Sequence, residues 1–222
     1  MQNTTLNFKQ QMDTSALSYV VNGNYESIEN IISITPYVIV NNNKFIGELS
    51  SQNAGQYEIN ADFADAGSNI LSNYDVKVVR AVLTIEEKQT YIKAQNMNVV
   101  YNGNAVQFVA EMFTSENEKL ENAEIDYVIK LNGEIVREIK GAGNYIVEVS
   151  GNAGENYEIA TATFTVVVEK NAVSVEFGNL NVTYNKQNQM PTISVSAEQG
   201  LDVNGLYNVV MKLNGNAVES AV

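Results

Sequence analysis

The chain contains no cysteine, no histidine, no tryptophan and only two prolines. Without cysteine, the protein has no disulfides, no thiolate catalysis and no thiolate metal site. Without histidine, it lacks the usual acid or base near neutral pH and the commonest transition-metal ligand. These absences exclude much of enzyme chemistry. We therefore expect a protein without catalytic residues, bound metal or cofactor, in the cytosol or in an extracellular setting where no disulfide is needed.

Basic residues are also scarce. The chain has 13 lysines and arginines and 26 acidic residues, so its net charge is −13 and its isoelectric point is near 4.4. Such a chain repels phosphate backbones and anionic lipids, which disfavours nucleic-acid and membrane-surface partners. No apolar run approaches the 18 residues of a membrane-spanning helix. The first residues do not form a signal peptide, so we expect any export signal or anchor to lie outside this segment.

What the chain does contain is a repeated pattern. The stretch Asn-Ala-Gly-Gln-Tyr-Glu-Ile at 53–59 matches Gly-Ala-Gly-Asn-Tyr-Ile-Val at 141–147, with Ala54 and Ala142 separated by 88 positions. Each stretch is followed by an Asn-Tyr pair, at 73–74 and at 156–157. Repetition at this spacing predicts a tandem array of modules and not one enzyme-sized domain.

The residues between the repeats alternate in polarity as β-strands do. Tyr145, Val147 and Val149 alternate with Ile146 and Glu148, as expected for a strand with one buried face. Asn-Gly pairs at 102–103 and 132–133 predict tight turns, and the acidic stretch 115–122 predicts a loop. About seven strands in roughly 88 residues are typical of a β-sandwich. The predicted strands of this middle repeat are 81–85, 98–101, 106–113, 125–131, 134–139, 145–149 and 157–168.

The sequence thus predicts an all-β fold of tandem immunoglobulin-like β-sandwich modules in an extended array, with repeats at 1–80, 81–170 and 171–222. No proline-rich or glycine-rich linker separates them, so we expect a semi-rigid rod whose repeats are one another's neighbours. The third repeat has about five of the seven strands. Either this repeat is cut short, or another chain completes it by strand exchange through 172–222.

The Gly-x-Tyr motif has the spacing of a tyrosine corner, in which a tyrosine hydroxyl bonds backward to the backbone near the sixth strand. We assign this role to Gly55 with Tyr57 and to Gly143 with Tyr145, where glycine permits a positive φ or a close approach. Stacking of these tyrosines on a sugar is the alternative, and their fixed place between glycine and an aliphatic residue favours structure. The tyrosines of the two Asn-Tyr pairs, Tyr74 and Tyr157, receive the same interpretation.

These patterns resemble the repeat called MBG, for "mostly beta, glycine-rich". The resemblance lies in the two Gly-x-Tyr stretches, the two Asn-Tyr pairs, the segment 80–85 and the Tyr-Asn-Gly turn at 101–103. This chain departs from the family pattern by being rich in asparagine, and by carrying Lys186 where that turn has glycine. The family has no catalytic residues to transfer. The resemblance implies a bacterial cell-surface or secreted protein and a spacer or adhesive role.

Three further chemistries have candidate residues in the sequence. The carboxylate pairs Asp62/Asp65 and Glu116/Glu118 lie on predicted loops, where solvated acids are favoured over glycosidase carboxylates. Weak calcium binding by Asp62, Asp65 and Asn69 stays open. So does an isopeptide bond from a strand lysine, Lys130 or Lys77, to an asparagine, although surface exposure is the usual state of lysine.

The leading hypothesis is a non-enzymatic spacer that projects a distal domain from a bacterial surface. The alternative is a binding module that contacts a host protein or a glycan through loops or exposed tyrosines. The tyrosines outside the corner motif, Tyr25, Tyr91 and Tyr101, are its candidate contacts. An enzyme is the weakest hypothesis, because it would require paired carboxylates in a deep, water-excluding pocket.

Overall fold

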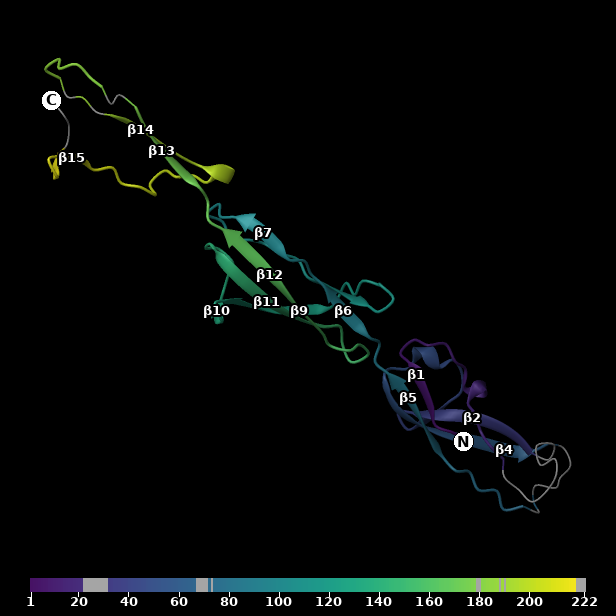
Figure 1. Ribbon diagram of the computed structural model, residues 1–222. Helices are drawn as coiled ribbons and strands as arrows, with labels where there is room; N and C mark the ends of the chain where they lie inside the picture. The colour runs from purple at the N-terminus through teal and green to yellow at the C-terminus, as the bar shows by residue number, and fades with distance from the viewer. Residues whose placement is uncertain are drawn as a thin grey trace. The chain divides into compact units, whose positions relative to one another are not determined.

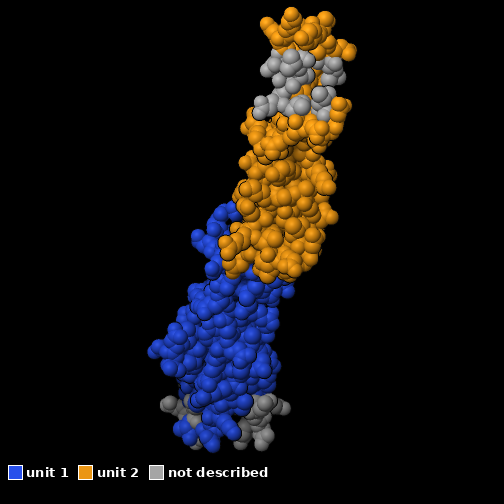
Figure 2. Space-filling view, turned by 90° about the vertical axis from the view of Figure 1, so that its left-hand side faces the viewer, with its two compact units in different colours: residues 1–93, 111–125, 150–161 blue, residues 94–110, 126–149, 162–222 orange. Residues whose placement is uncertain are grey.

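The computed structural model describes residues 1–21, 32–66, 72, 74–178, 181–187, 189 and 191–218. Strands and short 3-10 turns form the regular structure of this described part, which contains no α-helix (Figure 1). The chain divides into two compact units, which Figure 2 colours separately. The division into three repeats stays a prediction. The first unit comprises Met1–Lys93, Glu111–Ile125 and Ser150–Thr161, and the second Ala94–Ala110, Asp126–Val149 and Ala162–Val222.

Five strands form the first sheet, in the order β1-β5-β4-β2-β3. β1 runs parallel to β5, with Thr4 opposite Leu83, and the other neighbours are antiparallel. We call the segment from β1 to β5 the first module. The parallel pairing of β1 with β5 joins the first strand of this module to its last. The strands are β1 (Thr4–Asn7), β2 (Ile32–Val40), β3 (Asn43–Phe45), β4 (Gly55–Asp65) and β5 (Ala81–Glu86).

The second five-stranded sheet repeats this arrangement. Its order is β7-β12-β11-β9-β10, and β7 again runs parallel to β12, with Met97 opposite Val166. Each strand of the first sheet therefore has a counterpart at the same place in the second. The strands are β7 (Met97–Val100), β9 (Glu124–Leu131), β10 (Glu134–Val136), β11 (Gly143–Asn152) and β12 (Ala160–Glu169).

A hydrophobic core lies on one face of the first sheet. Val38, Ile59 and Leu83 on its three central strands are fully buried. Among the described residues, the opposite layer includes two 3-10 helices, η1 (Thr14–Ala16) and η3 (Leu49–Ser51), which bring Leu17 and Leu49 into this core. Burial of apolar side chains between two layers stabilises the sandwich, at about 25 cal/mol per Å² removed from water.

The second module also has two layers. The strands β6 (Thr90–Lys93) and β8 (Glu111–Thr114) form an antiparallel pair, with Ile92 opposite Met112. Both side chains lie against Gly151 of β11, where an added Cβ would come within 2.9 Å of the Met112 sulfur. Glycine within a strand often marks a place where another part of the chain approaches closely. At Gly151, it permits the two layers to pack in contact.

Asparagine-containing turns set the hairpins, as the sequence predicts. Asn132 and Gly133 have φ of 53° and 87°, the type I′ geometry that joins β9 to β10. The pair Asn214-Gly215 does the same between β15 (Met211–Leu213) and β16 (Asn216–Val218). Lys186 has a φ of 66° where the equivalent Gly103 has 86°, so the lysine adopts the conformation of the turn glycine that it replaces.

Beyond β12, the described chain forms two separate strand pairs. β13 (Val173–Gly178) pairs with β14 (Thr192–Ala197), which leads into the turn η5 (Glu198–Gly200), and β15 pairs with β16. No side chain described between 171 and 218 is fully buried. These pairs therefore contribute no closed core of their own within the described residues.

Four predicted strands differ from the structure. The strand predicted at 134–139 ends at Val136, the last residue of β10. Ala81–Glu86 belongs to the first sheet, because it pairs with β4 and β1, and so it ends one module instead of opening the next. Residues 106–110 lie outside any strand, and only 111–113 of the strand predicted at 106–113 belong to β8. The last strand begins at Ala160 and not at Tyr157, because the Tyr157 and Glu158 amides bond to Gly154 and Lys88.

The chain thus has an all-β fold of tandem immunoglobulin-like β-sandwich modules. Among the described residues, no helix has the length and apolar character needed to cross a membrane.

Candidate functional site

The two Gly-x-Tyr motifs have one geometry. The hydroxyl of Tyr57 donates a hydrogen bond to the carbonyl oxygen of Asn53 at 2.8 Å, and Tyr145 donates to Gly141 at 2.9 Å. Each bond reaches four residues back, as in a tyrosine corner. The Tyr145 ring is buried, whereas the Tyr57 ring is half-buried. Burial first, and the nearby charge of Glu155 second, raise the pKa of Tyr57.

The two glycines of these corners act differently. Gly55 has a φ of +146°, which L side chains rarely adopt. Gly143 has no such angle, but an added Cβ would lie 2.8 Å from Leu131 Cδ1. Positive φ therefore explains one glycine and close approach explains the other. Tyr74 and Tyr157 are both half-buried, and Tyr157 packs edge-on against Phe8 with 5.7 Å between ring centroids. Asn73 lies outside the described residues.

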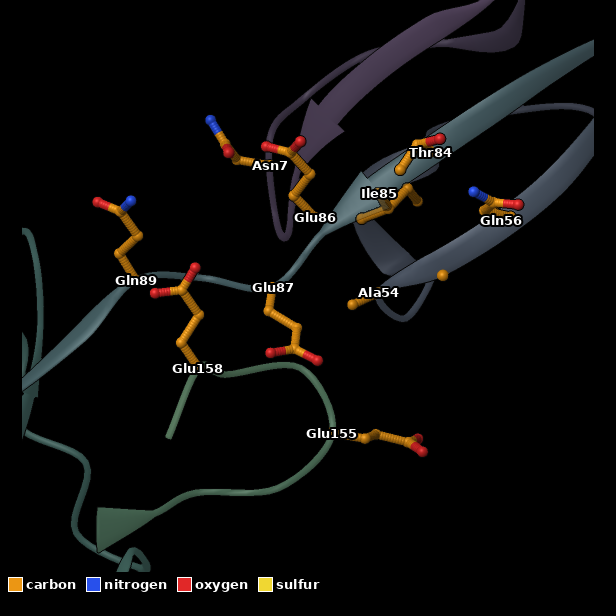
Figure 3. A pocket seen from close by; sticks show the side chains of 11 residues that line it. Asn7, Ala54, Gln56, Thr84, Ile85, Glu86, Glu87, Gln89, Glu155 and Glu158 are labelled. Atoms are coloured by element: carbon orange, nitrogen blue, oxygen red, sulfur yellow. The ribbon is translucent and has the colours of Figure 1, made fainter. Parts of the chain in front are cut away.

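An open cleft of about 540 Å³ lies in the first unit, beside the corner of the first sheet. Four glutamates line it, and Figure 3 shows Glu87 and Glu158 on facing segments of the chain. The described residues contain no group of three or more acidic, histidine or cysteine side chains that could hold a metal ion. The cleft is acidic and open, unlike the deep, water-excluding pocket that the enzyme hypothesis requires. The glutamates are Glu86, Glu87, Glu155 and Glu158.

The predicted carboxylate pairs are placed as follows. Asp62 and Asp65 lie in β4 and not in a loop, and residues three apart on a strand point to opposite faces of the sheet. They therefore do not face one another across a ligand. Asp62 pairs with Lys44 across the sheet. Asn69, the third predicted calcium ligand, lies outside the described residues.

Glu116 and Glu118 do lie in a loop, after β8, and both pair with Lys88. The Lys88 Nζ is 2.5 Å from the Glu116 carboxylate and 3.3 Å from that of Glu118. The Lys88 side chain is only 12% exposed. Its hydrogen bond to Glu116, with smaller contributions from Glu118, raises the pKa of Lys88 against the opposing effect of burial. The two acids therefore neutralise a lysine.

The isopeptide lysines have other surroundings. Lys130 on β9 donates to the Glu148 carboxylate of β11 at 2.7 Å, a cross-strand ion pair on the outer face of the sheet. Lys77 is exposed in the segment before β5. An isopeptide bond from either lysine stays a prediction.

Two candidate ligand-contact tyrosines are described, and Tyr25 lies outside the described residues. Tyr91, on β6, is 38% exposed, stacks on Phe113 at 5.7 Å between centroids, and donates its hydroxyl to Asn117. Tyr101 follows β7 and is half-buried, and its amide donates to Glu169 at the end of β12. Phe8 makes the same bond to Glu86 at the end of β5, so Tyr101 occupies the equivalent place in its own module.

Sequence reasoning missed Lys88 itself and the contact between two loops near it. We name residues 53–55 the corner loop and residues 153–158 the Asn-Tyr loop. The Ala54 amide of the corner loop donates to Asn156 Oδ1 of the Asn-Tyr loop at 2.8 Å. The recurrence of the Asn-Tyr pair was the available signal, but by itself it predicted only the start of a strand.

Comparison with known proteins gives likenesses of low similarity. No family model matches the sequence, and no curated protein matches it. The three N-terminal domains of the bacteriophage RB49 highly immunogenic outer capsid protein align over 90% of this chain and 72% of theirs, with 14% identity and a TM-score of 0.31. Fibronectin(III)-like modules of Clostridium thermocellum CbhA align over 83% of this chain and 95% of theirs, with 9% identity and a TM-score of 0.28.

Drosophila N-cadherin EC1-4 aligns over 88% of this chain and 57% of its own, with 10% identity and a TM-score of 0.26. Similarity at this level says nothing of ligand or activity.

Proposed function

We propose that this chain is a non-enzymatic spacer segment of a large bacterial cell-surface or secreted protein, built of MBG-like repeats that hold a distal functional domain away from the cell. One observation carries the proposal. Two sheets with the same strand order and the same parallel pairing follow one another along the chain, and each has its own tyrosine corner.

This repetition suits a mechanical role. A module that closes its own hydrophobic core adds length to an array without depending on distant parts of the chain. The first core fits this description, because the buried members that the structure describes all lie between Leu6 and Ile85. The net charge of −13 repels polyanions, which keeps such a segment from binding nucleic acids or anionic lipid surfaces.

Surface location is tested by treating intact cells with a protease that does not enter them. Peptides from this segment should be released from intact cells of the organism that produces the parent protein. Release only after lysis would overturn the proposed location. The spacer role is tested in the full-length parent by deleting one repeat. The distal domain should lose reach to its target while its activity in solution is retained, and an unchanged reach would contradict the spacer role.

A binding module is the second candidate, and the Tyr91–Phe113 pair favours it. Tyr91 is exposed and stacks on the half-buried Phe113, so its ring offers an aromatic face of the kind that sugar rings or protein side chains cover. Tyr91→Ala should then abolish binding of the protein to a panel of host glycans and surface proteins, whereas Ile135→Ala, which alters an exposed side chain elsewhere, should not. Binding that is absent in the wild type, or unchanged by Tyr91→Ala, contradicts this role.

A further inference from the structure

The contact between the corner loop and the Asn-Tyr loop joins residues more than 100 positions apart. Asn156 uses both ends of its side-chain amide, since Oδ1 accepts from the Ala54 amide at 2.8 Å and Nδ2 donates to Asn53 Oδ1 at 3.2 Å. Asn53 Nδ2 in turn donates to Glu155 at 3.2 Å. An aspartate at position 156 would lack the N–H donor, and an alanine would lack both the donor and the acceptor. Asparagine is therefore the residue that this contact requires.

The corner loop is itself held by the tyrosine corner. The Asn53 carbonyl oxygen accepts the Tyr57 hydroxyl, while the Asn53 side chain bonds to Asn156. One residue thus belongs to the latch of the first sandwich and to the contact with the Asn-Tyr loop. Edge-on packing of Phe8 against Tyr157 adds an apolar contact beside these polar ones.

The linker between β5 and β6, residues 87–89, runs between two loops of the second module and bonds to both. The Lys88 amide donates to the Asn156 carbonyl at 2.9 Å, and the Lys88 carbonyl accepts from the Glu158 amide at 3.1 Å. On its other side, the Lys88 ammonium group pairs with Glu116 and Glu118. A linker with its backbone and side chain both bonded in this way has little freedom to bend.

The next linker, between β12 and β13, has the same design with different chemistry. Asn171 lies there at the place that Lys88 has in the first linker. Its side chain accepts from the Glu198 amide at 3.0 Å and donates to the Glu198 carbonyl at 2.7 Å and to the Tyr101 carbonyl at 2.8 Å. Glu198 follows β14 as Glu116 follows β8. Two linkers thus bond to the loop after the equivalent strand.

We propose that the Asn-Tyr loop and the linker lysine form a stiff joint, in which each module docks its Asn-Tyr loop on the corner loop of the module before it. The partner that binds a corner loop is therefore the next repeat of the same chain. This inference rests on the proposed spacer function and deepens it, because a spacer transmits reach only when its joints resist bending. The Asn-Tyr pair, recurrent in the sequence, is a docking motif.

Pulsed electron spin resonance on the whole chain measures the stiffness of this joint as the width of the distance distribution between two spin labels. The chain has no cysteine, so labels at Thr35→Cys and Asn122→Cys go only to these two exposed sites, both in the first unit. The wild type should give one narrow distance distribution. Asn156→Ala and Lys88→Met should broaden it. Asn98→Ala and Lys130→Met are matched controls, because each removes a comparable side-chain contact away from the joint, and neither should broaden the distribution.

Amide exchange reads the same contact without labels. In Asn156→Ala, the Ala54 amide should exchange about fivefold faster, because one hydrogen bond contributes about 1 kcal/mol. Should that variant fold poorly, Asn53→Ala removes the facing side chain, leaves the carbonyl that Tyr57 uses and should give the same broadening. A broad wild-type distribution, or variants as narrow as the wild type, overturns the joint. Surface location would stand in that case, because protease release from cells does not depend on stiffness.

Discussion

The hydroxyl of Tyr145 donates a hydrogen bond to the carbonyl oxygen of Gly141, and the ring that carries it is 3% exposed. The same bond in the first module comes from a half-buried ring, that of Tyr57. Because the hydroxyl of a buried tyrosine cannot exchange its partner for water, the two corners should differ in what they contribute to stability.

Removing the hydroxyl tests this difference. Tyr145→Phe should lower the free energy of unfolding by about 1 kcal/mol, the usual contribution of one hydrogen bond. Tyr57→Phe should cost less, since water reaches its partner. Urea unfolding of both variants measures the effect. Equal stability of Tyr145→Phe and the wild type would contradict the structural role of the corner.

The β9–β10 turn makes a backbone prediction. Gly133 has a φ of +87°, and no atom lies within 4 Å of an added Cβ, so the backbone conformation alone should penalise a side chain. Gly133→Ala should lower stability by about 1–2 kcal/mol, the cost of a left-handed conformation for an L residue. Gly141→Ala is the control, because its φ is outside this range and its Cβ would meet only ordinary contacts. Thermal unfolding compares the two, and equal losses would show that the turn conformation is not limiting.

Lys88 gives the stability a dependence on alkaline pH. Its pKa is raised in the folded state, chiefly by the hydrogen bond to Glu116. A raised folded pKa stabilises the protein fully below the unfolded pKa, and the contribution is lost as pH rises through the folded pKa. Stability should therefore fall above a lysine's ordinary pKa of about 10.4. The measurement is the free energy of unfolding from neutral pH to about one unit above that value.

Two lysine variants identify the group responsible. Lys88→Gln should lower stability at neutral pH and flatten the decline, because the titrating partner of Glu116 is gone. Lys140→Gln, at an exposed lysine, should leave the curve as in the wild type. A decline as steep in Lys88→Gln as in the wild type would show that another group is responsible.

The strand β13 presents Val173, Val175 and Phe177 on one face, each more than half exposed. Exposed apolar strands pair with other chains. The protein should therefore associate through 172–222 at high concentration, as measured by size-exclusion chromatography with light scattering. Val175→Ser with Phe177→Ser should restore a monomer. A wild type that stays monomeric at all concentrations would rule out strand exchange.

The sequence predicted the elements whose local signals agree with their packing. The Asn132-Gly133 turn and the alternation of Tyr145, Val147 and Val149 are such signals, because turn chemistry and period-2 burial act on neighbouring residues. The tyrosine corners follow from the same spacing. The strand predicted at 81–85 was assigned to the wrong sheet, because its alternation cannot show which strands it will pair with.

The joint could not be predicted from the sequence for a related reason. Asn156 is one polar residue among many asparagines, and its partner Ala54 has no side chain that marks it. Lys88 stands in an acidic stretch where a lysine suggests only solvent exposure, yet the fold brings Glu116 and Glu118 to it. Contacts between distant segments depend on the fold, whereas the strand pattern is local.

Mechanical unfolding of the whole chain tests the central claim, that two sandwiches of one design follow each other and close their own cores. Pulled from its ends, the chain should unfold in two discrete events of similar size. Each should release about 80–90 residues, or roughly 300 Å of chain at about 3.5 Å per residue. A single event that releases the whole chain at once would contradict the account, because it would mean one fused core.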